Sequence, residues 1–240
     1  MAGCGSSTSA GTTASPRPAQ TRVLVFSRTL GYRHASIPDG IAAIEELGRE
    51  HGFSVDSTED AAAFTPANLS RYRVLVFLSS TGEVLEGSQR HALQGFIHRG
   101  GGWVGIHAAA DSLYDWPWYG SLLGTWFASH PAIQPARVRV DDPKDPATRG
   151  LPNPWNWTDE WYNFRSDPRQ HVHVLLTLDE TSYEGGKMGS DHPLAWEHEF
   201  DGGRAWYTGL GHQPATFASP VFRSFLLAGI GYAAGLAYLK

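Results

Sequence analysis

Three short, continuous apolar runs constrain this chain more than any other feature. They are RVLVFS at residues 22–27, RVLVFLS at 73–79 and WVGI at 103–106. An apolar run without polar alternation is typical of a strand that is buried on both faces of a parallel sheet. A further short strand is expected at residues 53–57. Helical patterns separate these strands, so the sequence predicts a three-layer α/β fold with a doubly wound, mostly parallel sheet.

The segments between these strands carry the start signals of helices. Ser36, followed by Pro38, predicts a helix that begins there, and Thr65 and Ser88 predict two more. The first of these helices has one apolar face, formed by residues at helical spacing: Ile37, Ile41, Ile44 and Leu47.

Beyond Tyr119 the pattern is less regular. The expected elements are strands at 137–140 and 172–178, a Pro-rich connection at 141–156, a hairpin of 193–200 and 204–209 around Asp201-Gly202-Gly203, and a closing helix at 215–236. No internal repeat is present, and 240 residues fit one domain of this class. We therefore expect residues 22–240 to form a single domain.

Residues 1–21 differ from the rest of the chain in composition. They are mostly Ser, Thr, Gly, Ala and Pro, which cannot bury enough apolar surface to fold, so we expect a flexible tether. Cys4, the only cysteine, follows Ala2-Gly3 and resembles the lipid-carrying cysteine of a bacterial lipoprotein. The apolar segment that precedes such a cysteine would then lie upstream of Met1. This pattern predicts an anchored, extracytoplasmic protein; the alternative is a cytoplasmic protein with a disordered tail.

Composition limits the partners. The net charge of -5 is spread along the chain without basic runs, so no nucleic acid partner is expected. No stretch approaches the roughly 18 apolar residues of a membrane span, so contact with a membrane would depend on a lipid at Cys4. Seven of the nine Trp lie between Trp103 and Trp161. Such a cluster is typical of an aromatic core or a homodimer face, or of a surface that stacks on sugar rings.

The stretch GGGWVGIHAAADS at residues 100–112 has the pattern of a nucleophile elbow. A short strand makes a sharp turn and continues into small, helix-forming residues. Hydrolases and amidotransferases have Ser or Cys at this turn, whereas this chain has His107. Because no cysteine is near the elbow, covalent thiol chemistry of the glutaminase kind is excluded.

Three histidines are expected at one rim of the sheet. His34 follows the first strand, His107 ends the strand that enters the elbow, and His212 follows the last predicted strand. Ligands of an open parallel sheet bind where the carboxyl ends of its strands meet, so these imidazoles should lie close together. Asp111 comes four residues after His107 and would share its helix face. Either Asp111 or a backbone carbonyl would fix the tautomer of His107.

Two motifs add candidates in loops. FASHP carries His130, and TDEWYNF carries Asp159, Glu160 and Tyr162 among tryptophans. A carboxylate in such surroundings tends to have a raised pKa, which suits a general acid or base. The alternative for these carboxylates is a loop cap or a salt bridge.

The segment PLAWEHEF at residues 193–200 predicts a strand with an apolar face. Alternation puts Trp196 and His198 on that face and Glu197 on the other. A buried imidazole needs a hydrogen-bond partner. His198 is therefore either a core histidine with a partner or, together with Trp196, a substrate contact.

Six motifs together resemble those of the ThuA-like (trehalose-utilisation) family. They are, in order, GYRH, GIHAAAD, the Phe-x-x-His that ends at His130, DEWY, PLAWEH and GRAWYTGLGH, and the resemblance extends from Arg22 to Tyr232. It implies a class I glutamine amidotransferase-like fold, related to flavodoxin-like arrangements. The catalytic Cys and His of the amidotransferases match the positions of His107 and His212. The resemblance also implies bacterial sugar catabolism, often beside dehydrogenases that make keto-sugars.

These residues are compatible with three functions. The first is a carbohydrate-active hydrolase, lyase or isomerase that acts on a glycoside or keto-sugar by acid–base chemistry. In this enzyme His107 and Glu160 would exchange protons, and His34 and His212 would polarise oxygens. The substrate contacts would come from Asp111, His130, Asp159, Tyr162, Trp196 and His198. The second function is a metal-dependent hydrolase or isomerase that uses the histidines to hold zinc or a similar divalent ion. The third is a non-catalytic sugar-binding lipoprotein.

Overall fold

The computed structural model describes residue 1 and residues 21–236. Cys4 and nearly all of the expected tether fall within residues 2–20, outside the described part. Among the described residues, every helix is too short or too polar to cross a membrane.

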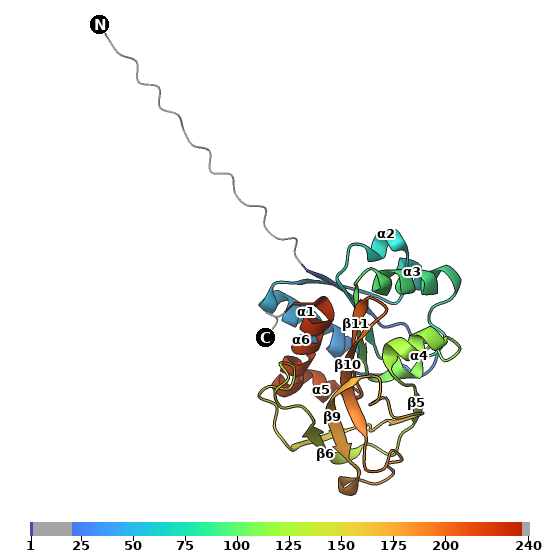
Figure 1. Ribbon diagram of the computed structural model, residues 1–240, viewed down its shortest axis with the longest axis vertical. Helices are drawn as coiled ribbons and strands as arrows, with labels where there is room; N and C mark the ends of the chain where they lie inside the picture. The colour runs from blue at the N-terminus through green and yellow to red at the C-terminus, as the bar shows by residue number, and fades with distance from the viewer. Residues whose placement is uncertain (2–20, 237–240) are drawn as a thin grey trace.

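One nine-stranded sheet runs through the described molecule in the order β2-β1-β3-β4-β11-β10-β9-β6-β7 (Figure 1). The strands from β2 to β11 in this order are parallel to their neighbours. The remaining pairs are antiparallel. The bounds of the nine strands are β1 (Arg22–Phe26), β2 (Ser54–Thr58), β3 (Val74–Leu78), β4 (Gly102–Ile106), β6 (Gln134–Val140), β7 (Trp155–Asp159), β9 (His173–Asp179), β10 (Pro193–Phe200) and β11 (Gly203–Thr208). A second sheet pairs β5 (Phe127–Ser129) with β8 (Asn163–Phe164).

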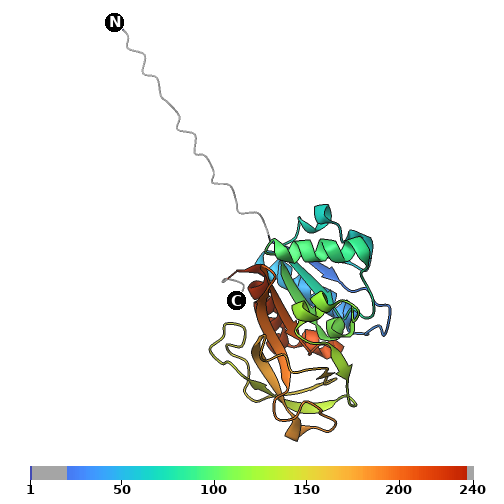
Figure 2. The same ribbon diagram turned by 45° about the vertical axis from the view of Figure 1, so that its right-hand side comes forward.

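Helices cover both faces of the sheet, which completes the three layers (Figure 2). One face carries α1 (Ile37–His51), α5 (Pro214–Ala218) and α6 (Pro220–Ala234), and the other carries α2 (Pro66–Leu69), α3 (Gly87–His98) and α4 (Pro117–Leu123). Three 3-10 helices complete the chain: η1 (Ala61–Ala63), η2 (His107–Asp111) and η3 (Glu180–Ser182). The predicted α/β class and doubly wound arrangement are confirmed.

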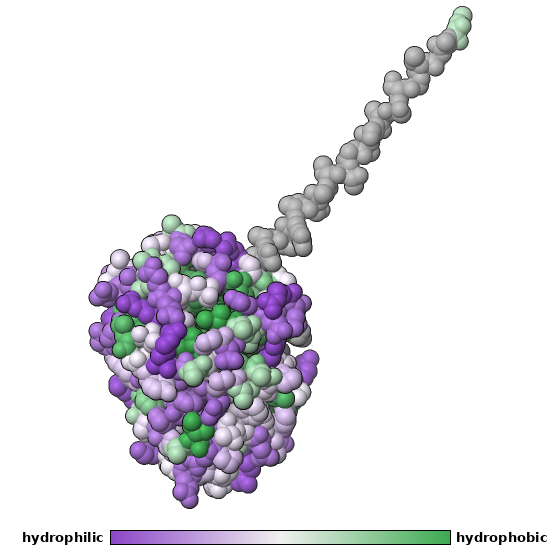
Figure 3. All heavy atoms as spheres, turned by 180° about the vertical axis from the view of Figure 1, so that it is seen from behind, coloured by the Kyte–Doolittle hydropathy of each residue, from purple (hydrophilic) through white to green (hydrophobic). Residues whose placement is uncertain are grey.

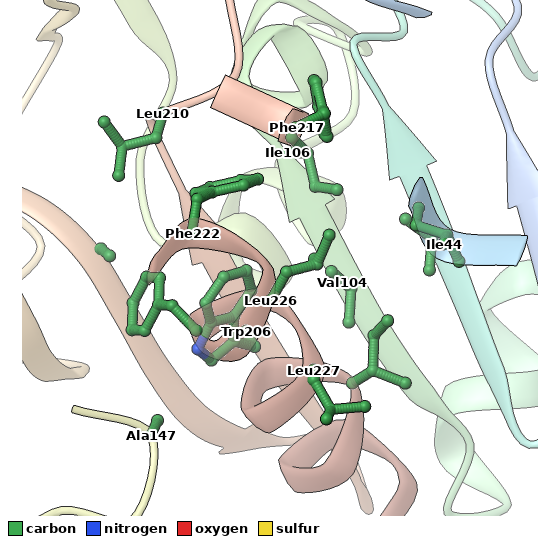
Figure 4. Close-up of a cluster of buried hydrophobic side chains, with 14 of the residues drawn as sticks. Ile44, Val104, Ile106, Ala147, Trp206, Leu210, Phe217, Phe222, Leu226 and Leu227 are labelled. Atoms are coloured by element: carbon green, nitrogen blue, oxygen red, sulfur yellow. The ribbon is translucent and has the colours of Figure 1, made fainter. Parts of the chain in front are cut away.

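A dense apolar cluster lies beneath the carboxyl ends of the central strands. Ile106, at the end of β4, packs in one cluster with Leu210, Phe217 and Phe222 (Figure 4). Trp206 on β11 belongs to the same cluster and is fully buried. Residue 107 and the loop at 209–212 therefore lie directly above closely packed side chains. This packing fixes the backbone that would position the side chains of a site.

Several boundaries differ from the sequence predictions for local reasons. The helix predicted from Ser88 has its N-cap at Glu86, because Glu86 and Gln89 form a capping box. The predicted closing helix is interrupted, and α6 begins anew at Pro220, with Ser219 capping it. Strand β7 begins at Trp155, before the predicted end of the Pro-rich connection, and pairs with β6 at the edge of the sheet.

The surface on one side of the molecule is mainly polar. The face behind the view of Figure 1 shows hydrophilic and neutral side chains, with apolar patches that are small and separate (Figure 3). Large apolar side chains that are exposed in the described part are Met1, Leu30, Tyr32 and Ile133. Two of these lie in the loop between β1 and α1, which also carries His34. This loop is therefore the place where exposed aromatic surface and a candidate site meet.

Candidate functional site

His107 stands at a strained turn directly after β4. Its φ of 50° lies in the left-handed region, which residues with a side chain rarely adopt, so the predicted sharp elbow is confirmed. The ring Nδ1–H donates to the carbonyl of Gly209 at 2.8 Å. The hydroxyl of Tyr207 donates to the backbone carbonyl of His107 at 2.9 Å. Both partners belong to β11 or the loop after it, so the neighbouring strand holds the ring and the turn together.

Asp159 holds two distant segments in place. Its carboxylate accepts hydrogen bonds from the amide of the adjacent Glu160 at 2.9 Å and from the amide of Gly211 at 3.0 Å. The hydroxyl of Thr216 also donates to it, at 3.2 Å. Asp159 is fully buried, so it contacts the protein rather than solvent. This one carboxylate positions both Glu160 and the residue that precedes His212.

The predicted histidines and Glu160 converge on one point. Glu160 Oε2 lies 3.1 Å from His212 Nδ1 and 3.4 Å from His107 Nε2. The same nitrogens of His212 and His107 are 3.3 Å apart. The ring of His34 meets the rings of His107 and His212 edge-on, with centroids 4.8 and 5.1 Å away. We call His34, His107, Glu160 and His212 the rim cluster.

The rim cluster perturbs the ionisation of Glu160, His212 and His34. Burial opposes the charge of Glu160, but its contacts with His107 and His212 outweigh burial and hold its pKa well below the usual range. Burial also opposes the charge of His212, yet Glu160 raises the pKa of His212 above its ordinary value. Burial lowers the pKa of His34 to about 3, so this ring is neutral at physiological pH. Glu160 is thus an ionised carboxylate, not the raised-pKa group that its tryptophan-rich motif predicted.

Aromatic rings and a further histidine surround the rim cluster. Tyr162 stacks on His107 with centroids 4.2 Å apart, and Phe127 packs on Tyr162 at 4.4 Å. His130 Nδ1 lies 3.1 Å from Glu160 Oε1, and the side chain of His130 is 44% exposed. Tyr32 meets His34 edge-on at 4.8 Å and is 64% exposed. The exposed rings of Tyr32 and His130 mark the side from which a ligand would approach.

Three of the predicted residues lie outside this arrangement. Trp196 is fully buried and donates from its indole to the carbonyl of Leu123 at 2.7 Å, so the expectation that it contacts substrate is corrected. His198 pairs with Ala205 on β11, three residues before Thr208, and its ring contacts the carbonyl of Ser121 at 3.2 Å. It therefore lies towards the opposite end of the strand from the rim cluster.

Asp111 is the third residue that stands apart. Because η2 is a 3-10 helix, the spacing of four residues does not bring Asp111 onto the face of His107. Its carboxylate instead accepts a hydrogen bond from the hydroxyl of Tyr114 at 2.7 Å. Burial raises the pKa of Asp111, against the effect of that bond. Of the two groups expected to fix the tautomer of His107, the backbone carbonyl of Gly209 is the one in place.

The tryptophan-rich segment is divided between core and half-buried positions. Trp103 and Trp161 are fully buried, and Trp155 is nearly so. Trp118 is partly exposed, but its indole donates to Asp201 in the hairpin that precedes β11, at the end of that strand remote from the rim cluster. The exposed aromatic beside the site is Tyr32, which was not among the predicted site residues. Its only signal in the sequence was its place close to His34 in the motif GYRH.

Comparisons with known proteins agree with this architecture. The sequence profile of the ThuA family, described as trehalose utilisation, matches residues 22–233. The chain belongs to the ThuA family. A ThuA-like protein from Bacteroides uniformis is 26% identical, with a TM-score of 0.77 over 93% of this chain and 95% of the other. A ThuA-like protein from Parabacteroides merdae is 20% identical, with a TM-score of 0.76 over 92% of each chain. A search of curated proteins returned no match.

More distant structures share the fold alone. A GMP synthase protein from Thermoplasma acidophilum is 13% identical, with a TM-score of 0.54 over 90% of this chain and 95% of the other. A β-galactosidase from G. stearothermophilus is 14% identical, with a TM-score of 0.58 over 92% of this chain and 30% of that enzyme. The glutamine amidotransferase-like fold of this ThuA protein is confirmed. The family match links the protein to carbohydrate use.

Proposed function

We propose that this ThuA protein is a carbohydrate-active enzyme that transforms a glycoside or keto-sugar by acid–base chemistry at the rim cluster. The observation that carries the proposal is the convergence of four ionisable side chains from four separate segments at the carboxyl ends of the strands. A purely structural role gives no reason to gather three imidazoles and a carboxylate, because such groups lose hydration on burial. The family's association with trehalose utilisation supports a sugar as the substrate.

The hydrogen bonds suggest a role for each residue. The Nδ1–H of His107 is committed to Gly209, so a neutral His107 presents the lone pair of Nε2 to the rim cluster and can accept a proton. His212, whose pKa Glu160 raises, can act as the proton donor. For a keto-sugar, His107 would take a proton from the carbon beside the carbonyl, and protonated His212 would stabilise the oxygen that gains negative charge. His34 and Tyr32 would contact the sugar.

The test is turnover of a panel of glucosides and their keto derivatives, followed by NMR spectroscopy. We expect His107→Ala to reduce kcat/KM by about 10²–10⁴-fold, the usual contribution of a positioned acid or base. His198→Ala is the matched control, because it removes a partly buried imidazole away from the rim cluster, and it should leave turnover unchanged. A His107→Ala protein with full activity would overturn the proposal. Sugar binding without product across the panel would favour a non-catalytic binding protein instead.

A further inference from the structure

We propose that the rim cluster binds one divalent cation of the zinc type. The inference deepens the proposed function and rests on it for the ion's place in catalysis. An ion bound to Nε2 of His107 and Nδ1 of His212 would take the place of the proton transfer assigned to these nitrogens and would itself polarise the carbonyl of the sugar. The binding itself is argued from geometry and is tested without any substrate. One ligand atom from each of the four residues lies within 4.8 Å of all the others.

The distances between the ligand atoms match the spacing of ligands in a metal site better than the lengths of strong hydrogen bonds. The three contacts among Glu160 Oε2, His212 Nδ1 and His107 Nε2 measure 3.1, 3.3 and 3.4 Å. Charge-assisted N–H···O bonds are about 2.7–2.9 Å long, so these contacts are longer than strong hydrogen bonds. In a tetrahedral zinc site with bonds of about 2.0–2.2 Å, neighbouring ligand atoms are about 3.3–3.6 Å apart. The observed triangle is close to one face of such a tetrahedron.

The hydrogen bonds behind the ligands also fit a metal site. A carbonyl can only accept, so Nδ1 of His107 carries the hydrogen that Gly209 receives, and Nε2 of a neutral ring is left with a lone pair. Histidines that bind metals are usually oriented in this way, with the second ring nitrogen donating to a carbonyl or a carboxylate. Glu160 is oriented as well, because Asp159 holds its backbone amide.

His34 supplies an independent sign that a partner is missing. The residue is buried, and its Nδ1 has no hydrogen-bond partner among the described atoms. Buried polar atoms are nearly always satisfied, so such an orphan calls for an explanation. A cation in the rim cluster that binds through Nδ1 would satisfy this atom and make the ring a ligand. The exposed side, near Tyr32 and His130, would leave room for a sugar oxygen as a fifth ligand.

The ligand set indicates the kind of cation. Three imidazole nitrogens and one carboxylate oxygen suit zinc and similar transition metals, whereas calcium and magnesium prefer oxygen ligands. With neutral rings the cluster carries a charge of about −1, and a divalent ion would make the site net positive. A positive site of this kind would polarise the carbonyl of a keto-sugar.

The experiment measures metal binding directly. Untagged protein is stripped with a chelator and titrated with Zn²⁺ by calorimetry, and elemental analysis counts the bound ion. We expect one equivalent per chain. His107→Ala and Glu160→Gln should each weaken Zn²⁺ binding by at least about 100-fold, because loss of a ligand should exceed the 10–100-fold cost of losing a group that only supports one. Glu160→Gln keeps the size of the side chain, so it guards against simple misfolding.

Matched controls remove histidines elsewhere. His173→Ala and His198→Ala should retain the full stoichiometry and affinity for Zn²⁺. Absence of stoichiometric binding by the wild type, or equal binding by the wild type and Glu160→Gln, would overturn the metal site. Full turnover by the chelated enzyme would overturn the ion's place in catalysis, while leaving the proposed function standing. Stoichiometric binding with no sugar transformed would instead support the metal site and count against the proposed function.

Discussion

Two groups of histidine and carboxylate side chains stand out in the described part of the chain, and they are built in opposite ways. The rim cluster places three imidazoles around one carboxylate. The second, which we call the acidic cluster, places Asp142, Asp145 and Glu197 around the single ring of His173. Its ion-pair distances are 3.3, 4.0 and 3.8 Å, and the His173 side chain is 47% exposed. Solvent therefore reaches His173 and Asp142 of the acidic cluster, although Asp145 and Glu197 are largely buried, whereas the rim cluster is closed on most sides.

Burial and the type of neighbouring group together decide whether the buried carboxylate of each cluster is ionised. Glu160 is buried but contacts imidazoles, and its pKa falls. Glu197 is equally buried, but its Oε2 has no partner in the described part of the chain. Burial, together with the charge of Asp145, raises the pKa of Glu197 to about 8. Glu197 of the acidic cluster is thus expected to keep its proton at neutral pH. Glu160 of the rim cluster is expected to be an anion, either free or bound to a cation.

Exchanging the carboxylate of the rim cluster for an amide should produce the largest effect. Gln at position 160 can neither ionise nor stabilise a protonated His212, so we expect Glu160→Gln to lower kcat/KM by about 10³-fold. Turnover of the keto-sugar panel measures this effect. The same exchange in the acidic cluster, Glu197→Gln, serves as the control and should leave kcat/KM unchanged. Equal losses in both variants would mean that the two clusters do not differ in function.

For the free energy of unfolding, the larger effect is expected from the acidic cluster rather than from the rim cluster. The unfolded chain releases the Glu197 proton near pH 4.5, whereas the folded chain keeps it until about pH 8. The folded state therefore binds more protons in this window, and the free energy of unfolding falls as pH rises. Glu197→Gln should remove that slope and stabilise the protein at neutral pH by about 1–3 kcal/mol.

Urea unfolding of the wild type and Glu197→Gln at several pH values between 4.5 and 8 gives the measurement. The groups that act on Glu197 are Asp145, His173 and Tyr232. His173→Ala is the control for the contribution of the imidazole. Parallel stability curves for the wild type and Glu197→Gln would show that Glu197 ionises normally in the folded protein.

The smallest effect is expected at the open side of the rim cluster. Tyr32 is exposed beside His34, so its ring can stack on a sugar without touching the reacting atoms. Tyr32→Ala should raise KM roughly three- to tenfold, in line with about 1 kcal/mol for an aromatic contact, and change kcat little. Tyr32→Phe keeps the ring and should behave as the wild type. A large loss of kcat in Tyr32→Ala would place Tyr32 within the catalytic machinery instead.

The rim itself was predictable from the sequence because topology dictates it. Apolar runs identified β1, β3 and β4, and parallel strands place their carboxyl ends together, so His34, His107 and His212 could be assigned to one edge. Glu160 was a weaker prediction. It follows β7 at the far edge of the sheet, and Asp159 links this end of β7 to the rim through the amide of Gly211. No local pattern encodes a hydrogen bond between residues so far apart in the chain.

The predictions for Trp196 and Asp111 were wrong because they rested on local sequence patterns, whereas the surrounding fold decides where these side chains lie. Alternation in β10 separates Trp196 from Glu197, but helices or loops cover both faces of the sheet there, so alternation could not tell core from pocket. Both residues are in fact buried. The spacing of Asp111 assumed an α-helix, whereas the tight turn at His107 continues as a 3-10 helix. The tryptophan-rich segment could not be assigned from composition, because core and binding surfaces use the same residue.

The left-handed backbone at His107 has a consequence for anyone who redesigns this protein. A residue with a side chain pays an energetic penalty of roughly 1–2 kcal/mol in that conformation, and glycine would avoid it. Optimising the sequence for thermal stability alone would therefore favour Gly at this turn, and the imidazole would be lost. A relaxed backbone and the proposed role of the imidazole thus make competing demands on this one position, where the sequence has His.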